Sequence, residues 1–337
     1  MTAFRMPAEW SAHEGCLMAW PTRSDQWGPV LNDAKEEYAN VARAIAGFEP
    51  VTMVAPPGHG ADARAHCGPE ITVMELPLDD SWFRDSAPLF VLDGEGHRAG
   101  VDFRFNAWGR KHHPYDGDDR VSALLLDHLE VDRIASGMIL EGGSITVDGE
   151  GTLITTEQCL LHPNRNPGMN RDQIEAELKA RLGVRKVVWL PYGGLLDTET
   201  DGHVDGVCAF AAPGKVVVSL PDDTDHPDYA RMRANRAVLE ASTDAEGRPF
   251  EIVDVPQTAF AHVAGTDVEV SYLNYYIAND GVVVPVAGVP QDDEALAVIA
   301  AAHPGRKVVG VRAVTIAFGG GGVHCITQQI PVARPGA

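Results

Sequence analysis

The stretch at residues 319–329, GGGGVHCITQQ, is the most informative part of the sequence. Four consecutive glycines allow the backbone to approach a ligand closely or to adopt angles that other residues avoid. His324 and Cys325 follow this run directly. A thiol at the end of such a flexible turn predicts a nucleophile at Cys325. One cysteine is insufficient evidence, so the rest of the chain must supply its partners.

Strand-like and helix-like runs alternate along the whole chain. Strands are expected at 51–55, 89–92, 144–147, 152–155, 187–190, 216–220, 281–286 and 307–311, and helices at 32–46, 120–129, 171–182, 228–241 and 292–302. In the last helix, Leu296, Ile299 and Ala300 fall at helical spacing, and Asp292 or Asp293 is expected to be the N-cap. This alternation indicates an α/β fold built from repeated modules of roughly sixty to seventy residues.

A doubly wound nucleotide-binding sheet is the rival architecture. It requires a G-x-G-x-x-G after a strand or a G-x-x-x-x-G-K-[ST] loop, and the sequence has neither. The glycine run at 319–322 also lacks the Lys and the Ser or Thr that phosphates need. We therefore expect the repeated-module architecture.

Composition excludes several classes of protein. The 337 residues are 45% hydrophobic and contain no low-complexity linker, so a single domain over 1–337 is expected. The longest apolar runs, such as 282–286, are too short to cross a bilayer, which predicts no membrane partner and a cytoplasmic protein. The net charge of −21 repels nucleic acid and attracts small cations, although solubility alone also explains it.

The cysteines point to reduced thiols. They lie at positions 16, 67, 159, 208 and 325, an odd number without any Cys-x-x-Cys pair. This argues against a disulfide framework and against a structural zinc site.

A second motif spans residues 201–205, DGHVD. If the segment is extended, His203 and Asp205 point to the same side, so an acid/base group stands beside a fixed negative charge. A solvated surface turn explains the motif equally well. As a metal site it is weak, because no third or fourth ligand stands at a recognisable spacing.

Two further motifs carry carboxylates. Trp82 and Asp85 in the segment WFRD could hold a cation beside an aromatic ring, although Arg84 and Asp85 could equally form a surface pair. Glu141 precedes two glycines in LEGGS and could approach a ligand or simply belong to a turn. Arg165, in the turn-like segment 164–167, remains a possible pocket residue.

The spacing of these candidates is regular. Asp85, Glu141, His203 and Cys325 are separated by 56, 62 and 122 residues, and the last interval is close to twice the others. One catalytic residue per repeat, with one repeat silent, would produce this spacing. Equivalent strand ends that converge on one axis would then bring the four residues together.

Taken together, these motifs resemble the agmatine deiminases of the guanidino-group-modifying superfamily, which is related to bacterial peptidyl-arginine deiminases. The resemblance covers residues 6–331, essentially the whole chain. It is carried by the segments at 82–85, 140–144, 200–205 and 319–329, and also by MPAEW at 6–10, FNAWG at 105–109, NRNP at 164–167 and NYYIAN at 274–279.

The resemblance implies a five-bladed α/β propeller, the pentein fold, with pseudo-fivefold ββαβ modules around a central active site. It implies hydrolysis of agmatine to N-carbamoylputrescine and ammonia in putrescine and polyamine biosynthesis, without metal or cofactor. A homodimer is the expected state.

The resemblance also assigns roles to residues. Asp85 and Asp205 would clamp the guanidinium group, and Cys325 would form a covalent amidino intermediate. His203 would transfer protons, Glu141 would hydrogen-bond His203 or the substrate, and Trp82 would line the pocket.

Other functions remain open at this point. Free-arginine and peptidyl-arginine deiminases would share the same core, and an arginine α-carboxylate would need a cationic partner such as Arg84, Arg104, Arg110, Lys111 or Arg165. A silent binding protein for guanidino compounds would need the carboxylates but no thiol. A metal hydrolase is disfavoured by the ligand spacing.

Overall fold

The computed structural model describes residues 4–257 and 261–334. Within these residues, five sheets share one pattern of strands, and a small hairpin accompanies them. In each sheet an antiparallel pair is followed by a parallel strand that the chain reaches through a helix. This ββαβ module is the repeat that the alternation of strands and helices predicts.

One module illustrates how the sequence builds the repeat. Strands β7 (Ile145–Val147) and β8 (Thr152–Thr156) pair antiparallel, and β8 pairs parallel with β9 (Lys186–Leu190). The crossover between the parallel strands contains helix α8 (Arg171–Leu182), which has the predicted bounds. Asn170 and Gln173 form a capping box at its start, and Gly183 ends it in the left-handed conformation at φ 65°.

Three other modules follow the same order of elements. One module contains β4 (Leu89–Leu92), β5 (Arg98–Arg104), α6 (Asp118–His128) and β6 (Asp132–Ile139). A second contains β10 (Cys208–Ala212), β11 (Lys215–Ser219), α9 (Tyr229–Glu240) and β12 (Glu251–Val255). A third contains β15 (Tyr276–Ile277), β16 (Gly281–Val286), α10 (Gln291–Ala302) and β17 (Lys307–Arg312).

The remaining module joins the two ends of the chain. Strand β18 (Thr327–Pro331) pairs antiparallel with β1 (His13–Ala19), which pairs parallel with β2 (Val51–Ala55) after helix α2 (Leu31–Ala46). Helix α3 (Gly60–Cys67) and strand β3 (Thr72–Glu75) extend this sheet by one strand. Cys325 therefore lies directly before the strand that links the C-terminal segment to the N-terminal one.

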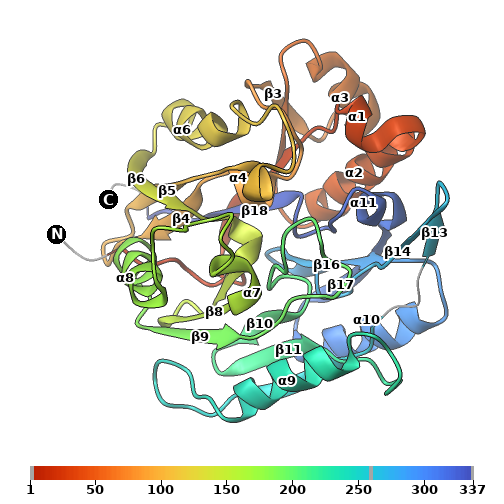
Figure 1. Cartoon of the computed structure of the whole chain (residues 1–337). Coiled ribbons are helices and arrows are strands. Elements are labelled where there is room, and N and C mark those ends of the chain that lie inside the picture. The colour runs from red at the N-terminus through yellow and green to blue at the C-terminus, as the bar shows by residue number, and fades with distance from the viewer. Residues whose placement is uncertain (1–3, 258–260, 335–337) are drawn as a thin grey trace.

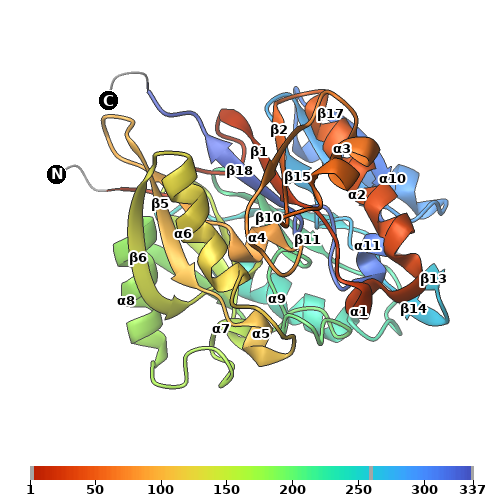
Figure 2. The ribbon, with the colours of Figure 1, turned by 90° about the horizontal axis from the view of Figure 1, so that it is seen from above.

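The modules surround a common centre, with their helices toward the outside of the molecule (Figures 1 and 2). Short connecting elements lie between them. These are α1 (Ser24–Trp27), η1 (Gly28–Val30), α4 (Phe83–Ser86), α5 (Ala107–Arg110), η2 (Gly142–Ser144), α7 (Glu157–Leu160), α11 (Val314–Phe318), and the hairpin of β13 (Ala261–Val263) and β14 (Thr266–Val268). The arrangement agrees with the predicted pentein fold.

A buried polar network connects the first and last modules. Glu49, between α2 and β2, accepts a hydrogen bond from the Tyr276 hydroxyl at 2.6 Å and one from the Asn279 backbone N–H at 2.8 Å. The Nδ1 atom of His13 lies 3.2 Å from the same carboxyl group. Since all of these side chains are largely withdrawn from water, each polar atom depends on the others for its hydrogen bonds.

One local prediction is wrong. Neither Asp292 nor Asp293 caps α10, because the helix begins at Gln291 with Pro290 in the N-cap position. Asp292 instead accepts hydrogen bonds from the backbone N–H groups of the preceding turn at residues 287–289. Ala300 is exposed, and the buried stripe of the helix contains Ala295, Ile299 and Ala302.

The five cysteines are free thiols, as the sequence predicts. No helix in the described part of the chain is long and apolar enough to cross a bilayer.

Candidate active site

The predicted site residues come together in the interior. Each precedes the first strand of a different module: Asp85 before β4, Glu141 before β7, Asp205 before β10 and Cys325 before β18. All four side chains are buried, as are Trp82 and His203. The regular spacing in the sequence thus reflects equivalent positions in successive modules.

The fifth module is not silent, contrary to the prediction. Asn274 precedes β15, and its side-chain amide donates a hydrogen bond to the Cys325 Sγ atom at 3.2 Å. Its carbonyl oxygen accepts one from the Cys325 backbone N–H, also at 3.2 Å. Asn274 was missed because it carries no charge and lies off the midpoint between His203 and Cys325, although its segment belongs to the motifs that carry the family resemblance.

Segment 201–205 is a series of bends and turns, so the condition of an extended segment is not met. His203 and Asp205 converge nevertheless, because both face Gly143. A Cβ atom on Gly143 would lie 2.6 Å from His203 Nδ1, 2.9 Å from Asp205 Oδ2 and 3.0 Å from Asp85 Oδ1. The absence of a side chain at Gly143 therefore allows the three groups to surround one small space.

Asp85 is oriented by two donors. The Gly143 backbone N–H donates to Oδ1, and the Trp108 indole N–H donates to Oδ2, both at 2.9 Å. Trp108 has a left-handed backbone conformation with φ 52°, which is uncommon for a bulky residue and sets the direction of its ring. The preceding Arg84 is buried and bonded to Gln329, so the alternative of an Arg84–Asp85 surface pair is wrong.

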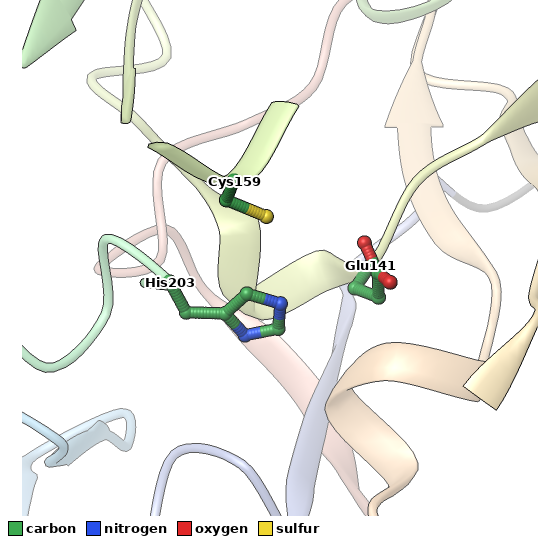
Figure 3. Close-up of side chains that lie close together, drawn as sticks. All are labelled: Glu141, Cys159 and His203. Carbon is green, nitrogen blue, oxygen red and sulfur yellow. The ribbon is translucent and has the colours of Figure 1, made fainter. Parts of the chain in front are cut away.

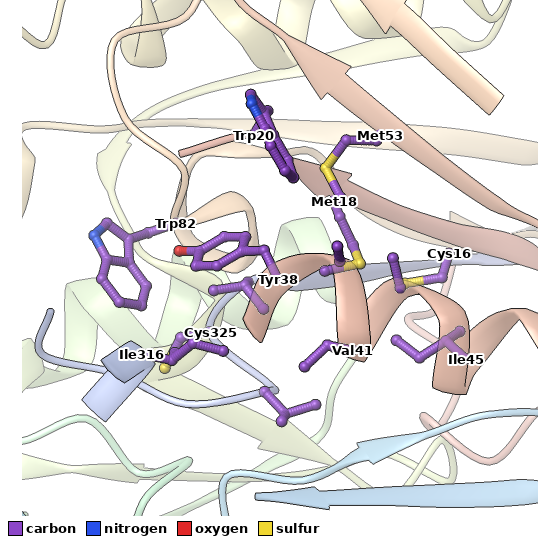
Figure 4. Close-up of a cluster of buried hydrophobic side chains, with 14 of the residues drawn as sticks. Cys16, Met18, Trp20, Tyr38, Val41, Ile45, Met53, Trp82, Ile316 and Cys325 are labelled. Carbon is purple, nitrogen blue, oxygen red and sulfur yellow. The ribbon is translucent and has the colours of Figure 1, made fainter. Parts of the chain in front are cut away.

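The glycine run fits closely around the thiol. A Cβ atom on Gly321 would lie 2.5 Å from the Trp82 ring and 3.1 Å from Cys325 Sγ, and one on Gly322 would lie 2.5 Å from the Asn274 carbonyl oxygen. Gly320 has φ 104°, a conformation open to glycine. Figure 4 shows Cys325 beside Ile316 at the edge of an apolar cluster that includes Tyr38 and Trp82.

Electrostatics disfavour a free thiolate. Burial raises the pKa of Cys325 well above its usual value, and the carboxylates of Asp205 and Asp85 raise it further. The Sγ atom lies 3.4 Å from Asp205 Oδ2 and can donate its proton to that oxygen. Burial alone would lower the pKa of His203, but the Asp85 carboxylate reverses the shift and raises it well above normal. In the unliganded site these shifts favour a neutral thiol and an imidazolium.

Glu141 is held by Arg165 instead of by His203. The guanidinium Nε atom of Arg165 donates to Oε1 of Glu141 at 2.6 Å, while Oε2 and both ring nitrogens of His203 have no hydrogen-bond partner among the described residues. Arg165 also donates to the Thr200 carbonyl and to Asp201. Arg165 therefore links Glu141 to residues 200 and 201, which is a structural role that the sequence did not reveal.

Glu141, Cys159 and His203 lie close together (Figure 3), and one ligand atom of each falls within 4.8 Å of the others. A thiol, an imidazole and a carboxylate are ligands that zinc accepts. However, the guanidinium of Arg165 contacts this carboxylate directly, and a fixed cation at this distance disfavours a second one. The cluster fits an ion pair beside an acid/base histidine better than a metal centre.

Two cavities reach Cys325. The larger has a volume of about 330 Å³, and its lining includes His203, Asp205 and Cys325, apolar side chains such as Phe318, and four further acidic residues: Asp197, Glu199, Asp267 and Glu269. The smaller is lined by Trp82, Asp85, Trp108 and Glu199 among others, so Trp82 does line a pocket beside the thiol. No described Lys or Arg lines either cavity.

The cationic candidates for binding a carboxylate are engaged elsewhere. Arg84 pairs with Gln329, Arg104 with Asp119 and Arg165 with Glu141. Lys111 donates to the carbonyls of Thr198 and Glu199 and to Asp201, and Arg110 is exposed. The lining of both cavities therefore carries acidic side chains without a described Lys or Arg among them.

Comparison with solved structures defines the class of protein first. Dimethylarginine dimethylaminohydrolase superposes with a TM-score of 0.54 at 15% identity, over 94% of this chain and all of that one. At that identity the likeness concerns the fold alone, and the fold is that of the α/β penteins.

The family follows from nearer relatives. Residues 5–331 match the family described as Porphyromonas-type peptidyl-arginine deiminase, and the chain belongs to that family. Agmatine deiminases of Stutzerimonas stutzeri and Pseudomonas aeruginosa are each 43% identical to it, over 97% and 98% of this chain and 95% and 96% of their own length. The solved agmatine deiminase of Enterococcus faecalis is 38% identical, with a TM-score of 0.93 over 98% of this chain and 96% of that one. The resemblance stated from the motifs is confirmed.

The raised pKa of Cys325 has a measurable consequence. Alkylation of Cys325 by iodoacetamide, followed by mass spectrometry, should be slow at pH 7 and should accelerate above pH 9, because only the thiolate reacts. Asp85→Asn removes one of the two nearby charges and should shift the profile to lower pH. Cys325→Ala identifies the signal that belongs to this residue. A profile with its midpoint below pH 7 in the unliganded protein would contradict the electrostatic interpretation.

Proposed function

We propose that this protein is an agmatine deiminase, which hydrolyses agmatine to N-carbamoylputrescine and ammonia in a route to putrescine. The observation that carries the proposal is the pairing of a buried thiol with two carboxylates at the end of an acidic cavity that no described Lys or Arg lines. A reactive thiol and a binding site for a dication are together what deimination of agmatine requires.

Binding of the guanidinium group begins the reaction. In the proposal Asp85 and Asp205 accept hydrogen bonds from its edges, and charge-assisted pairs of this kind orient the planar group. The central carbon then lies over Cys325 Sγ. The positive charge of the substrate offsets the two carboxylates that raise the pKa of Cys325, so binding itself favours the thiolate. Repeating the alkylation profile with excess agmatine tests this step, because a pKa that does not fall would exclude it.

The covalent half-reaction follows from these positions. The thiolate attacks the guanidinium carbon, and a C–S bond forms as the C=N bond becomes single. The imidazolium of His203 donates its proton to the departing amino group, which leaves as ammonia when the C–N bond breaks. An amidino-cysteine remains, and His203 is now neutral.

Hydrolysis completes the cycle. Neutral His203 takes a proton from water, whose oxygen attacks the amidino carbon. The second tetrahedral adduct then collapses: its C–S bond breaks and expels the Cys325 thiolate, its hydroxyl group loses a proton to solvent as the C=O bond forms, and the neutral ureido product is released. We propose that Glu141, held by Arg165, supports the positive charge of His203 through the field of its buried carboxylate. Trp82 forms one wall of the pocket.

Agmatine and arginine differ at the end of the molecule away from the guanidinium group, where arginine carries an α-carboxylate that agmatine lacks. The lining of the larger cavity includes Asp197, Glu199 and Asp267, and also Glu269, whose pKa is raised by burial to about 7. A primary ammonium group is attracted to this lining, whereas the α-carboxylate of free arginine is repelled by it. We therefore place arginine second as a substrate.

Three further proposals concern the state of the protein. We propose that residues 1–337 act as one catalytic domain, that two copies associate as a homodimer, and that the enzyme works in the cytoplasm, where its thiols stay reduced. Sedimentation analysis at micromolar concentration would give a mass of twice 36.2 kDa, and a single-chain mass would exclude the dimer.

Product release tests the reaction itself. Purified protein should release ammonia and a ureido product from agmatine, with a much lower kcat/KM for free arginine and for a blocked arginyl peptide. Cys325→Ala should lower agmatine turnover by at least about a thousandfold, because the covalent route is lost. Preferred turnover of arginine would overturn the substrate assignment, and no turnover of any of the three would revive a silent guanidine-binding protein.

Glu199 tests recognition of the distal amine, because it lines both cavities. Glu199→Gln keeps the shape of the side chain and removes its charge, so KM for agmatine should rise about five- to tenfold with little change in kcat. Glu251→Gln, an exposed carboxylate on β12, is the matched control. An unchanged KM would place the amine elsewhere in the cavity.

A further inference from the structure

A chain of charged side chains continues from the site into the N-terminal segment. His324 lies next to Cys325, and its Nδ1 atom is 2.9 Å from Asp205 Oδ2. Its Nε2 atom is 2.9 Å from Glu9 Oε1. The Arg84 guanidinium stands 3.6 Å from the same oxygen of Glu9. The side chains of His324, Asp205 and Glu9 are 7%, 6% and 14% exposed, so water contributes little.

Both ring nitrogens of His324 face carboxylate oxygens. An ionised carboxylate has no proton to donate, so it can act only as a hydrogen-bond acceptor. A neutral imidazole has one N–H donor, whereas the imidazolium has two. Both contacts can therefore be hydrogen bonds when His324 is protonated. Burial and Arg84 lower its pKa, but Glu9 and Asp205 raise it above the usual value overall. Despite burial, His324 and Arg84 hold the pKa of Glu9 at about 2.

The two carboxylates of the proposed clamp differ because of this chain. Burial would raise the pKa of Asp205, but the hydrogen bond and charge of His324 lower it below normal. Asp85 is paired less closely, since His203 Nδ1 lies 3.9 Å from its Oδ1 atom, and burial raises the pKa of Asp85 despite this charge. The Asp205 oxygen that contacts His324 is also the one that lies 3.4 Å from Cys325 Sγ.

We propose that Glu9 and His324 are positioning residues for deimination: Glu9 keeps His324 protonated, and the imidazolium fixes Asp205 as an ionised acceptor beside Cys325. The inference rests on the proposed function and adds two residues to it. Neither residue touches the reacting carbon, and both act through Asp205. Asp205, Glu9 and Arg84 act on His324 directly, and the titratable side chains of Tyr275 and Cys208 line the same small cavity as His324, Glu9 and Asp205.

A purely structural role is the competing explanation, since Glu9 also tethers residues 4–12 to the interior. Amide substitutions separate the two roles. His324→Asn can keep a donor near the Nδ1 position toward Asp205, whereas His324→Gln can keep one near the Nε2 position toward Glu9. If His324 and Glu9 only tether the N-terminal segment, the contact between His324 and Glu9 is the important one. If His324 positions Asp205, the contact between His324 and Asp205 is the important one.

Steady-state kinetics on agmatine test the proposal. We expect kcat/KM to fall about a hundredfold in His324→Gln and only about tenfold in His324→Asn, because the latter retains the contact with Asp205. Glu9→Gln removes one of the charges that raise the pKa of His324. The Glu9→Gln enzyme should therefore resemble the unmodified enzyme at pH 6. Its kcat/KM should fall as the pH rises past the lowered pKa of His324. Glu14→Gln, an exposed carboxylate on β1, is the control.

The proposal would be overturned in favour of a tether if kcat/KM fell equally in His324→Asn and His324→Gln and if the fall matched a lower melting temperature in both variants. A Glu9→Gln enzyme whose pH profile matches the unmodified one would also overturn it.

A measurement without substrate separates this inference from the proposed function. In protein labelled with ¹⁵N-histidine, the His324 signals, assigned with His324→Asn, should be those of an imidazolium at pH 7.5 and should titrate at lower pH in Glu9→Gln. A neutral ring at pH 7.5 in the unmodified protein would overturn the inference. Absence of agmatine turnover with the imidazolium intact would instead reject the proposed function and leave the charge assignment standing.

Discussion

Burying several carboxylates around one thiol imposes the strongest physical constraint on this molecule. Ionised groups that leave water lose several kcal/mol of solvation each unless they find partners. Glu141 is paired with Arg165, Glu9 with Arg84 and His324, and Asp205 with His324. The rest of the interior is arranged so that these partners arrive from distant parts of the sequence.

The module architecture makes this arrangement possible. In each module the segment before the first strand reaches the centre, so five segments meet there without any long excursion of the chain. Glycines permit their close approach, most clearly at Gly143, where any side chain would collide with His203, Asp205 and Asp85. The pairing of β18 with β1 then brings Glu9 from the N-terminal segment against His324.

The modular fold and most of the site residues were predictable from the sequence, because the repeat length and the reactive side chains form recognisable patterns. Alternating strands and helices indicated the α/β modules, and charged residues at regular spacing indicated the converging site. Asn274 could not be found in this way, since a neutral amide has no distinctive pattern. The partners Arg165 and Trp108 were equally hidden, because only the fold reveals that they contact Glu141 and Asp85. The conformation of segment 201–205 stayed open, because its side chains converge through a turn and not through strand alternation.

The positions of the cationic side chains explain why the pKa of Cys325 should differ between the empty site and the site with a bound guanidinium ion. His324 offsets the charge of Asp205, but in the empty site Asp85 has only His203, whose Nδ1 atom is 3.9 Å away, and two neutral N–H donors. Both carboxylates still raise the pKa of the Cys325 thiol, Asp205 more than Asp85. A bound guanidinium ion adds positive charge beside them. The group that completes the electrostatics of the interior is thus the substrate, and the nucleophile is favoured only when there is something for it to attack.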